Sequence, residues 1–244
     1  MDMENLIEEN SKNKSFLYKQ KTPLALKIIM DIFFALLVIC LLTITIFYII
    51  YLKTPVDGPS MMPTINAEYT DTNNIEDYAY INRFGKISSQ DIIVAHKINN
   101  DNKYVIKRLI ANSGEYIKIA KNEETNEIDI YIKQKLNSEP VILDEPYLYD
   151  KNDNIVTLNK FEALKINEEL TFTEDGYLYI DEDKVFYLGD NRARSEDCSN
   201  YGPVSKKLIV GRVDIIQKYN ESSIPIIYNF FINEIKTIFT FKKW

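Results

Sequence analysis

The sequence of 244 residues is poor in the residue types on which many enzyme sites depend. It contains two cysteines, one histidine and seven glycines. Two cysteines exclude a disulfide-rich scaffold and a cysteine-cluster metal site, and one histidine excludes a histidine-rich zinc site. At an average glycine usage of about 7%, roughly 17 would be expected, so each glycine should mark a position whose backbone needs it. The net charge of −7 argues against a nucleic-acid partner, which would require a basic face.

The hydrophobic residues are unevenly distributed, although they make up an ordinary 45% of the chain. Residues Ile32 to Leu52 form a run of 21 positions without a charge. As a helix, this run would measure about 31 Å, which is enough to cross the core of a bilayer. A buried core helix would be shorter, and a cleaved signal peptide would be shorter and would start earlier. We therefore predict one transmembrane helix over residues 28–52, with the lipid bilayer as a partner.

The lysines on the two sides of this run predict its orientation. One lysine, Lys53, follows within 20 residues of Leu52, whereas the 20 residues before Ile28 contain five: Lys12, Lys14, Lys19, Lys21 and Lys27. Because basic residues are retained inside the membrane, residues 1–27 should form a cytoplasmic tail. The chain would then be a single-pass protein of the cell membrane with its remaining domain outside the cytoplasm.

The outer domain, residues 53–218, is predicted to be mainly β. Tyrosine and isoleucine dominate it, and period-2 stretches recur. These patterns favour coiled or closed sheets rather than βαβ units. The predicted strands are Asp91–Lys97, Lys103–Ile110, Glu115–Ala120, Glu127–Lys133, Tyr177–Ile180, Val185–Leu188 and Leu208–Gln217. A weak helix is predicted over Leu158–Glu169, within a stretch, 121–184, that has no recognisable role.

The last segment, residues 219–244, is predicted to form an amphipathic helix. Apolar residues recur at helical spacing from Ile227 to Phe239, with polar residues between them. This helix could pack on its own domain or rest on the membrane surface. A second transmembrane span is disfavoured, because Glu234 and Lys236 would lie inside it.

Two segments suggest nucleophilic chemistry. Ser60 lies in Gly58–Thr64, a stretch of turn-forming residues directly after the hydrophobic run. Taken alone, this segment could be an ordinary turn. In the strand that follows, alternation places Lys107 between Val105 and Leu109 on one face, and Arg108 on the other. A lysine there could protect a sheet edge, or it could be a buried base, whose pKa would have to fall by about three units for neutrality at pH 7.

A third segment, Leu188–Val204, combines turn formers, charged residues and hydroxyl side chains between two predicted strands. Alone it could be an ordinary asparagine- and aspartate-rich loop. In this order and behind a membrane anchor, however, the three segments resemble the conserved boxes of bacterial type I signal peptidases. The resemblance covers residues 28–215 and includes Gln90–Ala95, Val105–Glu115 and Leu143–Leu148.

The resemblance implies a mechanism based on a serine and a lysine, without cofactor or metal. Ser60 would be the acylating nucleophile and Lys107 the general base. Ser195 would orient the lysine by a hydrogen bond, and Asp197 would support the site by pairing with arginine. The Ser60 backbone N–H would hold the oxyanion. The remaining residues implied to shape the site are Met61, Arg108, Gly189, Asp190, Asn191 and Arg192.

Several positions depart from the family pattern. Gly58 replaces a hydroxyl side chain that assists the oxyanion in Gram-negative members. The family's Asp-Ser-Arg sequence reads Asp197-Cys198-Ser199 here, so we expect Asp197 to rely on Arg108 instead. The single histidine, His96, lies on a different predicted strand from Lys107 and is expected to be structural.

The function implied is the removal of signal peptides from secreted preproteins by a membrane-bound serine endopeptidase. One alternative is a catalytically impaired homologue that acts as a surface assembly factor. Another is a related self-cleaving peptidase of the SOS-repressor type, which the membrane run and the acidic charge oppose. Secreted preproteins and the bilayer are the expected partners, and neither nucleic acid nor a metal is expected.

Overall fold

The computed structural model describes residues 23–70, 72, 76–98, 100–148 and 154–240. The chain divides into two compact units, Met1–Ile46 and Phe47–Trp244. Most of the predicted cytoplasmic tail, with four of its five lysines, lies outside the described residues, as do Lys242, Lys243 and Trp244.

The predicted transmembrane run forms helix α2, Leu24–Ile50. It contains an 18-residue window of mean hydropathy 2.9, and among the described residues it is the one helix long and apolar enough to cross a membrane. Its threonine hydroxyls are satisfied within the helix, as the hydroxyl of Thr43 donates to the carbonyl oxygen of Ile39 at 2.9 Å. The helix ends two residues before the predicted boundary, because Tyr51 and Leu52 pair with Asn82 and Ile81 of the adjacent strand instead.

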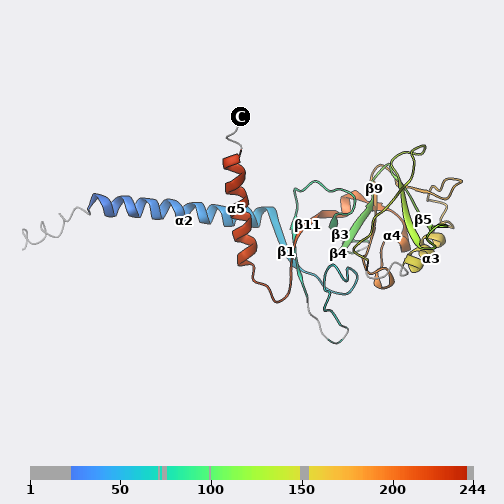
Figure 1. Ribbon diagram of the computed structural model, residues 1–244, viewed down its shortest axis with the longest axis horizontal. Helices are drawn as coiled ribbons and strands as arrows, with labels where there is room; N and C mark the ends of the chain where they lie inside the picture. The colour runs from blue at the N-terminus through green and yellow to red at the C-terminus, as the bar shows by residue number, and fades with distance from the viewer. Residues whose placement is uncertain (1–22, 71, 73–75, 99, 149–153, 241–244) are drawn as a thin grey trace, which may run out of the picture. The chain divides into compact units, whose positions relative to one another are not determined.

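The described part of the outer domain contains two sheets in which every strand pairing is antiparallel. The larger sheet has the strand order β1-β2-β11-β3-β4-β9-β10, and the smaller has the order β7-β6-β5-β8. Figure 1 labels β1, β11, β3, β4 and β9 of the larger sheet and β5 of the smaller. The strands are β1 (Tyr51–Pro55), β2 (Tyr78–Asn82), β3 (Ile92–Lys97), β4 (Asn100–Ala111), β5 (Tyr116–Lys121), β6 (Ile128–Lys133), β7 (Val141–Ile142), β8 (Leu178–Tyr179), β9 (Lys184–Leu188), β10 (Val204–Ser205) and β11 (Ile209–Gln217). Shifts of register within β4 and β11 bend the larger sheet. The predicted mainly β class behind one apolar N-terminal helix is confirmed.

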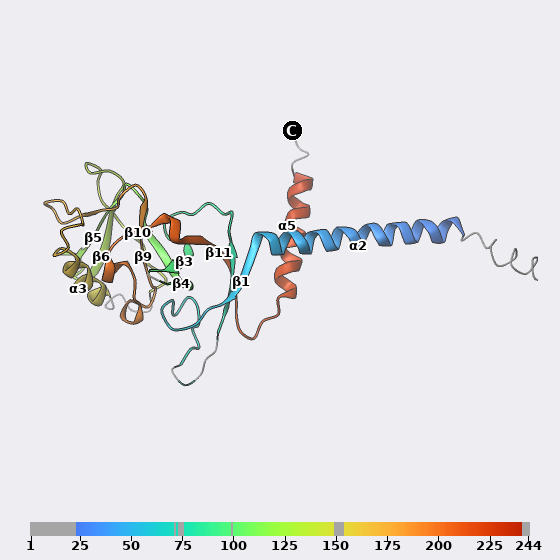
Figure 2. The same cartoon turned by 180° about the vertical axis from the view of Figure 1, so that it is seen from behind.

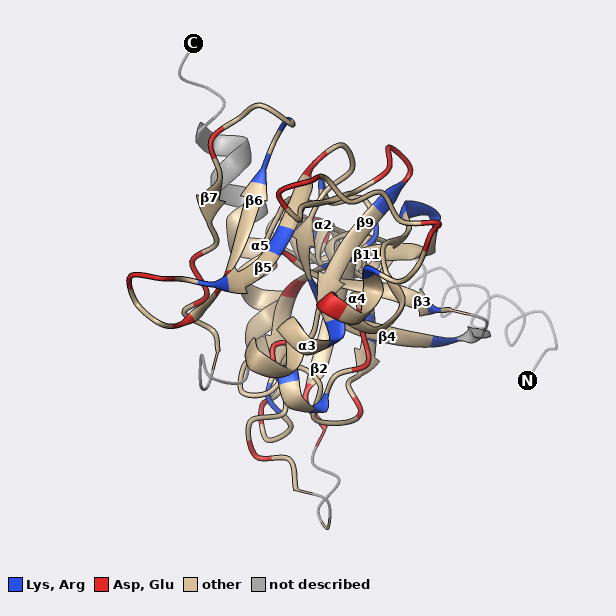
Figure 3. Ribbon diagram, turned by 90° about the vertical axis from the view of Figure 1, so that its right-hand side faces the viewer, with Lys and Arg blue, Asp and Glu red and all other residues tan. Residues whose placement is uncertain are grey.

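All seven predicted strands are present, whereas β1, β2, β7 and β10 were not predicted. β7 and β10 have two residues each and are too short to show an alternating pattern. Helix α3, Asn154–Leu164, begins four residues before the predicted helix and ends five residues before its end. Charged residues lie mainly in loops and at strand ends (Figure 3).

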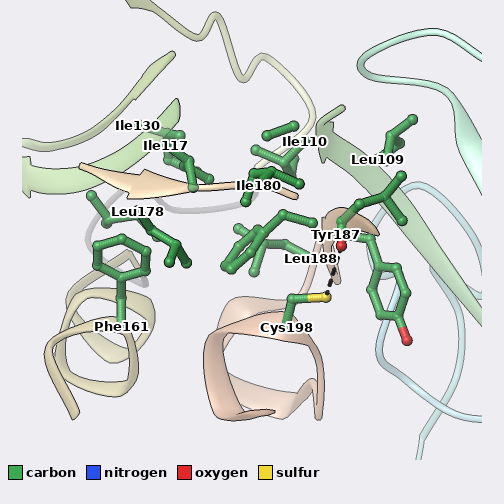
Figure 4. Close-up of a cluster of buried hydrophobic side chains, with 14 of the residues drawn as sticks. Leu109, Ile110, Ile117, Ile130, Phe161, Leu178, Ile180, Tyr187, Leu188 and Cys198 are labelled. Atoms are coloured by element: carbon green, nitrogen blue, oxygen red, sulfur yellow. Dashed lines mark hydrogen bonds between the residues drawn. The ribbon is translucent and has the colours of Figure 1, made fainter. Parts of the chain in front are cut away.

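Two hydrophobic clusters hold the domain together. The larger lies between the two sheets and receives Phe161 from α3 and Cys198 from helix α4, Cys198–Tyr201 (Figure 4). The smaller cluster lies beneath the segment that contains Ser60. It consists of Val56, Met61, Ile65, Ala79, Ile81, Val94 and Ile106.

The predicted C-terminal helix is present as α5, Ile224–Thr240. It follows β11 after a short connection (Figure 2). The Phe230 ring contacts the rings of Phe47 and Tyr51, with centroid distances of 5.2 and 6.1 Å. α5 therefore packs against the residues at which α2 ends and β1 begins.

Candidate active site

Ser60 lies on a turn that directly follows β1. Gly58 adopts a φ of +84°, a left-handed conformation that side chains disfavour. The turn is closed by the Met62 N–H, which donates to the Pro59 carbonyl at 3.1 Å. Met61 is 1% exposed and packs in the smaller hydrophobic cluster. The buried Met61 side chain thus anchors the turn next to Ser60.

Two buried polar residues that the sequence analysis missed fasten this turn. The amide nitrogen of Asn66 donates to the carbonyl oxygens of Val56 and Gly58 at 2.7 and 3.0 Å. Asn66 and Asp77 also bind each other's backbone N–H groups, both at 2.7 Å. The φ of Asn66 is 58°, a conformation that asparagine tolerates better than most residues. In the sequence, the one sign of this role was the presence of an asparagine shortly after the serine segment, which is a weak signal.

Lys107 lies on β4, a strand between β3 and β9, and is buried, with 5% of its surface exposed, so it does not protect a sheet edge. Its Nζ is 2.9 Å from the Ser60 hydroxyl and 2.9 Å from the carbonyl oxygen of Ile106. Burial lowers the pKa of Lys107 from 10.5 to about 8, and the nearby Asp197 carboxylate opposes this shift most strongly. The structure therefore brings the predicted nucleophile and the predicted base into hydrogen-bond contact.

Asp190 connects all three predicted segments. One of its carboxylate oxygens accepts a hydrogen bond from the Thr64 hydroxyl at 2.6 Å. The two oxygens bind Arg108 through its Nε at 2.8 Å and its Nη2 at 2.6 Å. The Arg108 guanidinium also lies over the Tyr147 ring, with its carbon 3.8 Å from the ring centroid. The expected pairing of Arg108 with Asp197 is wrong, because Asp190 takes the arginine in this bidentate geometry.

Gly189 allows the backbone of the third segment to approach Ser60 closely. A Cβ atom at Gly189 would lie 2.5 Å from the carbonyl oxygen of Ser60 and would collide with the Ser195 side chain. The Asn191 N–H donates to the same Ser60 carbonyl at 3.1 Å. A side chain at position 189 would therefore collide with its neighbours. This agrees with the expectation that each of the few glycines marks a position whose backbone needs it.

Ser195 departs from the sequence prediction. Its side chain is buried, but among the described residues its hydroxyl oxygen makes no hydrogen bond. The predicted hydrogen bond from Ser195 to Lys107 is not formed: within the described residues the Lys107 Nζ binds the Ser60 hydroxyl and the Ile106 carbonyl. The Ser195 side chain instead packs against Gly189.

Asp197 caps helix α4 and supports Gly189. Its carboxylate accepts hydrogen bonds from the Gly189 N–H at 2.9 Å, the Ser199 N–H at 3.1 Å and the Ser199 hydroxyl at 2.7 Å. Ser199 stands at the position where the family pattern has arginine. The Ser199 hydroxyl thus donates to Asp197 where the family pattern has an arginine. The neighbouring Cys198 is buried in the larger hydrophobic cluster.

Arg192 links this loop to the segment whose role could not be predicted. The 3-10 helix η2, Arg192–Arg194, follows Asn191. The Arg192 Nε donates to the Gly189 carbonyl at 3.1 Å, and its two terminal nitrogens bind Asn154 and Glu145. Asn154 in turn donates to Glu145 at 3.3 Å. Residues within 121–184 therefore help to hold Gly189 in place.

Ser60 and Lys107 face an open cleft of about 340 Å³. Its walls come from the end of β1, the serine turn, β3 and β4. The lining residues are Thr54, Pro55, Val56, Asp57, Ser60, Val94, Tyr104, Val105, Ile106 and Lys107. The His96 ring packs against Tyr104, with ring centroids 4.9 Å apart. Within the described part of the chain, no three His, Cys, Asp or Glu side chains are arranged to hold a metal ion.

Comparison with known proteins gives consistent matches. Residues 29–217 match the family model described as signal peptidase, peptidase S26. Signal peptidase I S of Bacillus subtilis (strain 168) is 29% identical over 179 residues, which cover 72% of this chain and 82% of that protein. Signal peptidase I U of the same organism is 30% identical over 200 residues, covering 81% and 88%. A crystal structure of a signal peptidase I from Enterococcus faecalis V583 is 25% identical and covers 53% of this chain and 97% of that one, with a TM-score of 0.33.

Proposed function

The chain belongs to the signal peptidase family, peptidase S26, and on that premise we propose that Ser60 and Lys107 are its catalytic dyad. Membership makes it a signal peptidase I, a serine endopeptidase that removes signal peptides. The observation that carries the proposal is the distance of 2.9 Å between Lys107 Nζ and Ser60 Oγ. This lies within the range over which a base can accept a proton from a nucleophile.

The dyad would act through an acyl-enzyme. Neutral Lys107 would accept the hydroxyl proton while Ser60 Oγ attacks the scissile carbonyl carbon. The Lys107 ammonium would then protonate the leaving amine, which departs as the mature protein. Water would next lose a proton to Lys107 and attack the ester, releasing the signal peptide and restoring Ser60.

Burial of Lys107 supports this role. At a pKa of about 8, about one-tenth of the side chains would be neutral at pH 7, compared with about one in several thousand at the pKa of 10.5 in water. The oxyanion would be held mainly by the Ser60 N–H, as Gly58 contributes no side chain. Asn191, Arg192 and Asp197 would act as positioning residues, because their contacts reach the backbone of Ser60 and Gly189 rather than the reacting atoms. Asp190 would do so through the side chains of Thr64 and Arg108.

The membrane helix would place the site where its substrate is presented. With the N-terminus cytoplasmic, α2 would end at the outer surface of the membrane, and Ser60 follows Ile50 by only ten residues. The apolar part of a signal peptide lies in the same bilayer and delivers its cleavage site to the same surface. Anchoring enzyme and substrate in one membrane would raise their effective concentration.

The test is cleavage of a purified preprotein by the full-length protein in lipid vesicles. We expect wild type to release the mature protein, and Ser60→Ala and Lys107→Met to lose activity. Lys103→Met, an exposed lysine on the same strand, is the matched control and should retain activity. Full activity of Lys107→Met would refute the dyad. An inactive wild type would favour the alternative of an impaired homologue that acts as a surface assembly factor.

Orientation is tested separately. Protease added to intact protoplasts should digest the outer domain and leave residues 1–27 protected. Digestion of residues 1–27 with protection of the outer domain would reverse the proposed topology.

A further inference from the structure

Helix α5 lies beyond residues 29–217, which match the family, and has no role in the proposed mechanism. One of its residues, Phe230, packs on Phe47 and Tyr51. Among the side chains of α5 that the structure describes, Ile224 is 75% exposed and Tyr228 is 61% exposed. Exposed large apolar side chains grouped on one face of a helix indicate a binding surface.

The stripe that these two side chains form with the half-buried Phe231 is not the face that packs on the domain. Ile224, Tyr228 and Phe231 are spaced by four and three residues, which places them on one face of the helix. At about 100° per residue, Phe230 lies roughly 120° around the helix from Ile224. Phe230 therefore attaches α5 to the domain through Phe47. The stripe of Ile224, Tyr228 and Phe231 lies on a different face of the helix from this contact.

The contact with Phe47 also fixes the depth of α5 relative to the membrane. The charge-free part of α2 runs from Ile32 to Ile50, about 28 Å of helix, which is close to the thickness of a bilayer core. Because Phe230 touches Phe47 and Tyr51, it lies at the outer boundary of that core. The last turn of α2 is also bound by a side chain of the domain, since Arg83 donates to the carbonyl oxygen of Ile49 at 2.7 Å.

A second transmembrane span does not fit α5. Its 17 residues would measure about 25 Å, which is shorter than the bilayer core. Asn229 and Asn233 lie on the side opposite the stripe and are exposed. An apolar stripe backed by polar residues, at the depth of the membrane surface, has the pattern of an interfacial helix.

We propose that α5 is a second membrane contact of this protein and lies in the plane of the outer bilayer surface. The stripe of Ile224, Tyr228 and Phe231 enters the acyl chains, and Asn229 and Asn233 face water. This inference rests on the proposed anchoring by α2. Two attachment points would fix the tilt of the catalytic domain relative to the membrane. A single transmembrane helix, joined to the domain through a short strand, would constrain this tilt less.

Depth-dependent fluorescence quenching tests this proposal without relying on activity. The chain has one tryptophan, Trp244, so Trp244→Phe gives a background for single probes. Tyr228→Trp reports on the stripe, and Asn229→Trp reports on the polar side of α5. Both probes are measured in the full-length protein in phosphatidylglycerol–phosphatidylcholine vesicles. We expect lipids brominated at shallow acyl carbons to quench the Tyr228→Trp probe several-fold more strongly than the Asn229→Trp probe, and aqueous iodide to show the opposite order.

Other quenching patterns would overturn the proposal. Quenching of the Tyr228→Trp probe by iodide alone would mean that the stripe is in water, and protection from both quenchers would mean that it packs on protein. Strongest quenching by bromine at deep acyl carbons would indicate a second span.

Activity provides a second readout. Tyr228→Asp should lower cleavage of a vesicle-embedded preprotein several-fold and leave cleavage of a soluble signal-site peptide unchanged. Asn229→Asp, with the same added charge on the polar side, should affect neither. Equal rates for Tyr228→Asp and Asn229→Asp on the embedded substrate would contradict a membrane role for the stripe. Inactivity of the wild type would refute the proposed function but would leave the quenching result intact.

Discussion

The side-chain nitrogen of Lys107 lies 2.9 Å from the hydroxyl oxygen of Ser60, although 47 residues separate them in the chain. Lys107 comes from the middle of a strand, and Ser60 comes from a turn that is anchored by the buried Met61. The same hydrogen bond joins a buried lysine to a half-buried serine that faces the cleft. Its consequences can be measured in both activity and stability.

The rate of cleavage should depend on pH through Lys107. Burial lowers its pKa to about 8, and only the neutral amine can accept the Ser60 proton. We therefore expect kcat/KM to rise about tenfold per pH unit below 8 and to level off above it. The profile is measured with a soluble peptide substrate in detergent. A rate that stays constant from about pH 6 to 9 would exclude Lys107 as a titrating base.

The same burial should make Lys107 unfavourable for folding at neutral pH. The unfolded lysine has a pKa of 10.5 and the folded one a pKa of about 8, so between these values the unfolded state binds more protons. Stability should therefore rise with pH from about 8 to 10.5, and the deficit that remains below 8 amounts to about 3 kcal/mol.

Lys107→Met removes this deficit while nearly conserving the volume of the side chain. We expect the variant to be inactive but more stable than wild type at pH 7, by up to about 3 kcal/mol. The gain in Tm should shrink as the pH rises toward 10, as measured by thermal unfolding in detergent. Lys103→Met is the exposed control on the same strand and should change Tm little. A lower Tm for Lys107→Met at pH 7 would show that the hydrogen bonds of the lysine outweigh its desolvation.

Gly189→Ala should damage the site through sterics alone. The added methyl group would lie 2.5 Å from the Ser60 carbonyl oxygen and would collide with Ser195. Overpacking of this kind destabilises by about 1–3 kcal/mol, and displacement of the Ser60 backbone should lower kcat more than it raises KM. Gly85→Ala is the control, since its methyl group would meet only the Asn82 side chain, at 3.1 Å. Equal activity of the two variants would show that Ser60 tolerates the displacement.

Particular residues show what the sequence could and could not predict. The seven predicted strands follow from local patterns. The pairing of Ser60 with Lys107 was implied by the family resemblance, and the alternation alone left open whether the lysine is buried or lies at a sheet edge. The partner of Arg108 does not follow from local patterns, because two aspartates, Asp190 and Asp197, follow within the same loop and only the folded backbone decides between them. The roles of Asn66, Asp77 and Glu145 were missed for a similar reason, since each stabilises the site through backbone or buried contacts to residues distant in the sequence.

Glu145→Gln should show that the segment 121–184 contributes to the active site. Glu145 and Arg192 form an ion pair whose side chains are only 5% and 1% exposed. Removing one charge leaves the other buried and uncompensated, which typically destabilises by about 3–5 kcal/mol. Because Arg192 also holds the Gly189 carbonyl, the loosened loop should slow cleavage even at temperatures where the variant remains folded.

The matched control for Glu145→Gln is Glu162→Gln. Glu162 also pairs with a basic residue, Lys165, but both side chains are largely exposed, at 48% and 39%. Exposed pairs contribute about 0–1 kcal/mol, so this variant should unfold and cleave like wild type. Denaturation curves and peptide cleavage are measured for both variants at the same pH. If Glu145→Gln lowers stability and leaves kcat unchanged, the Glu145–Arg192 pair supports only the fold. A parallel loss of both would place the segment 121–184 in the support of Ser60, through Arg192 and Gly189.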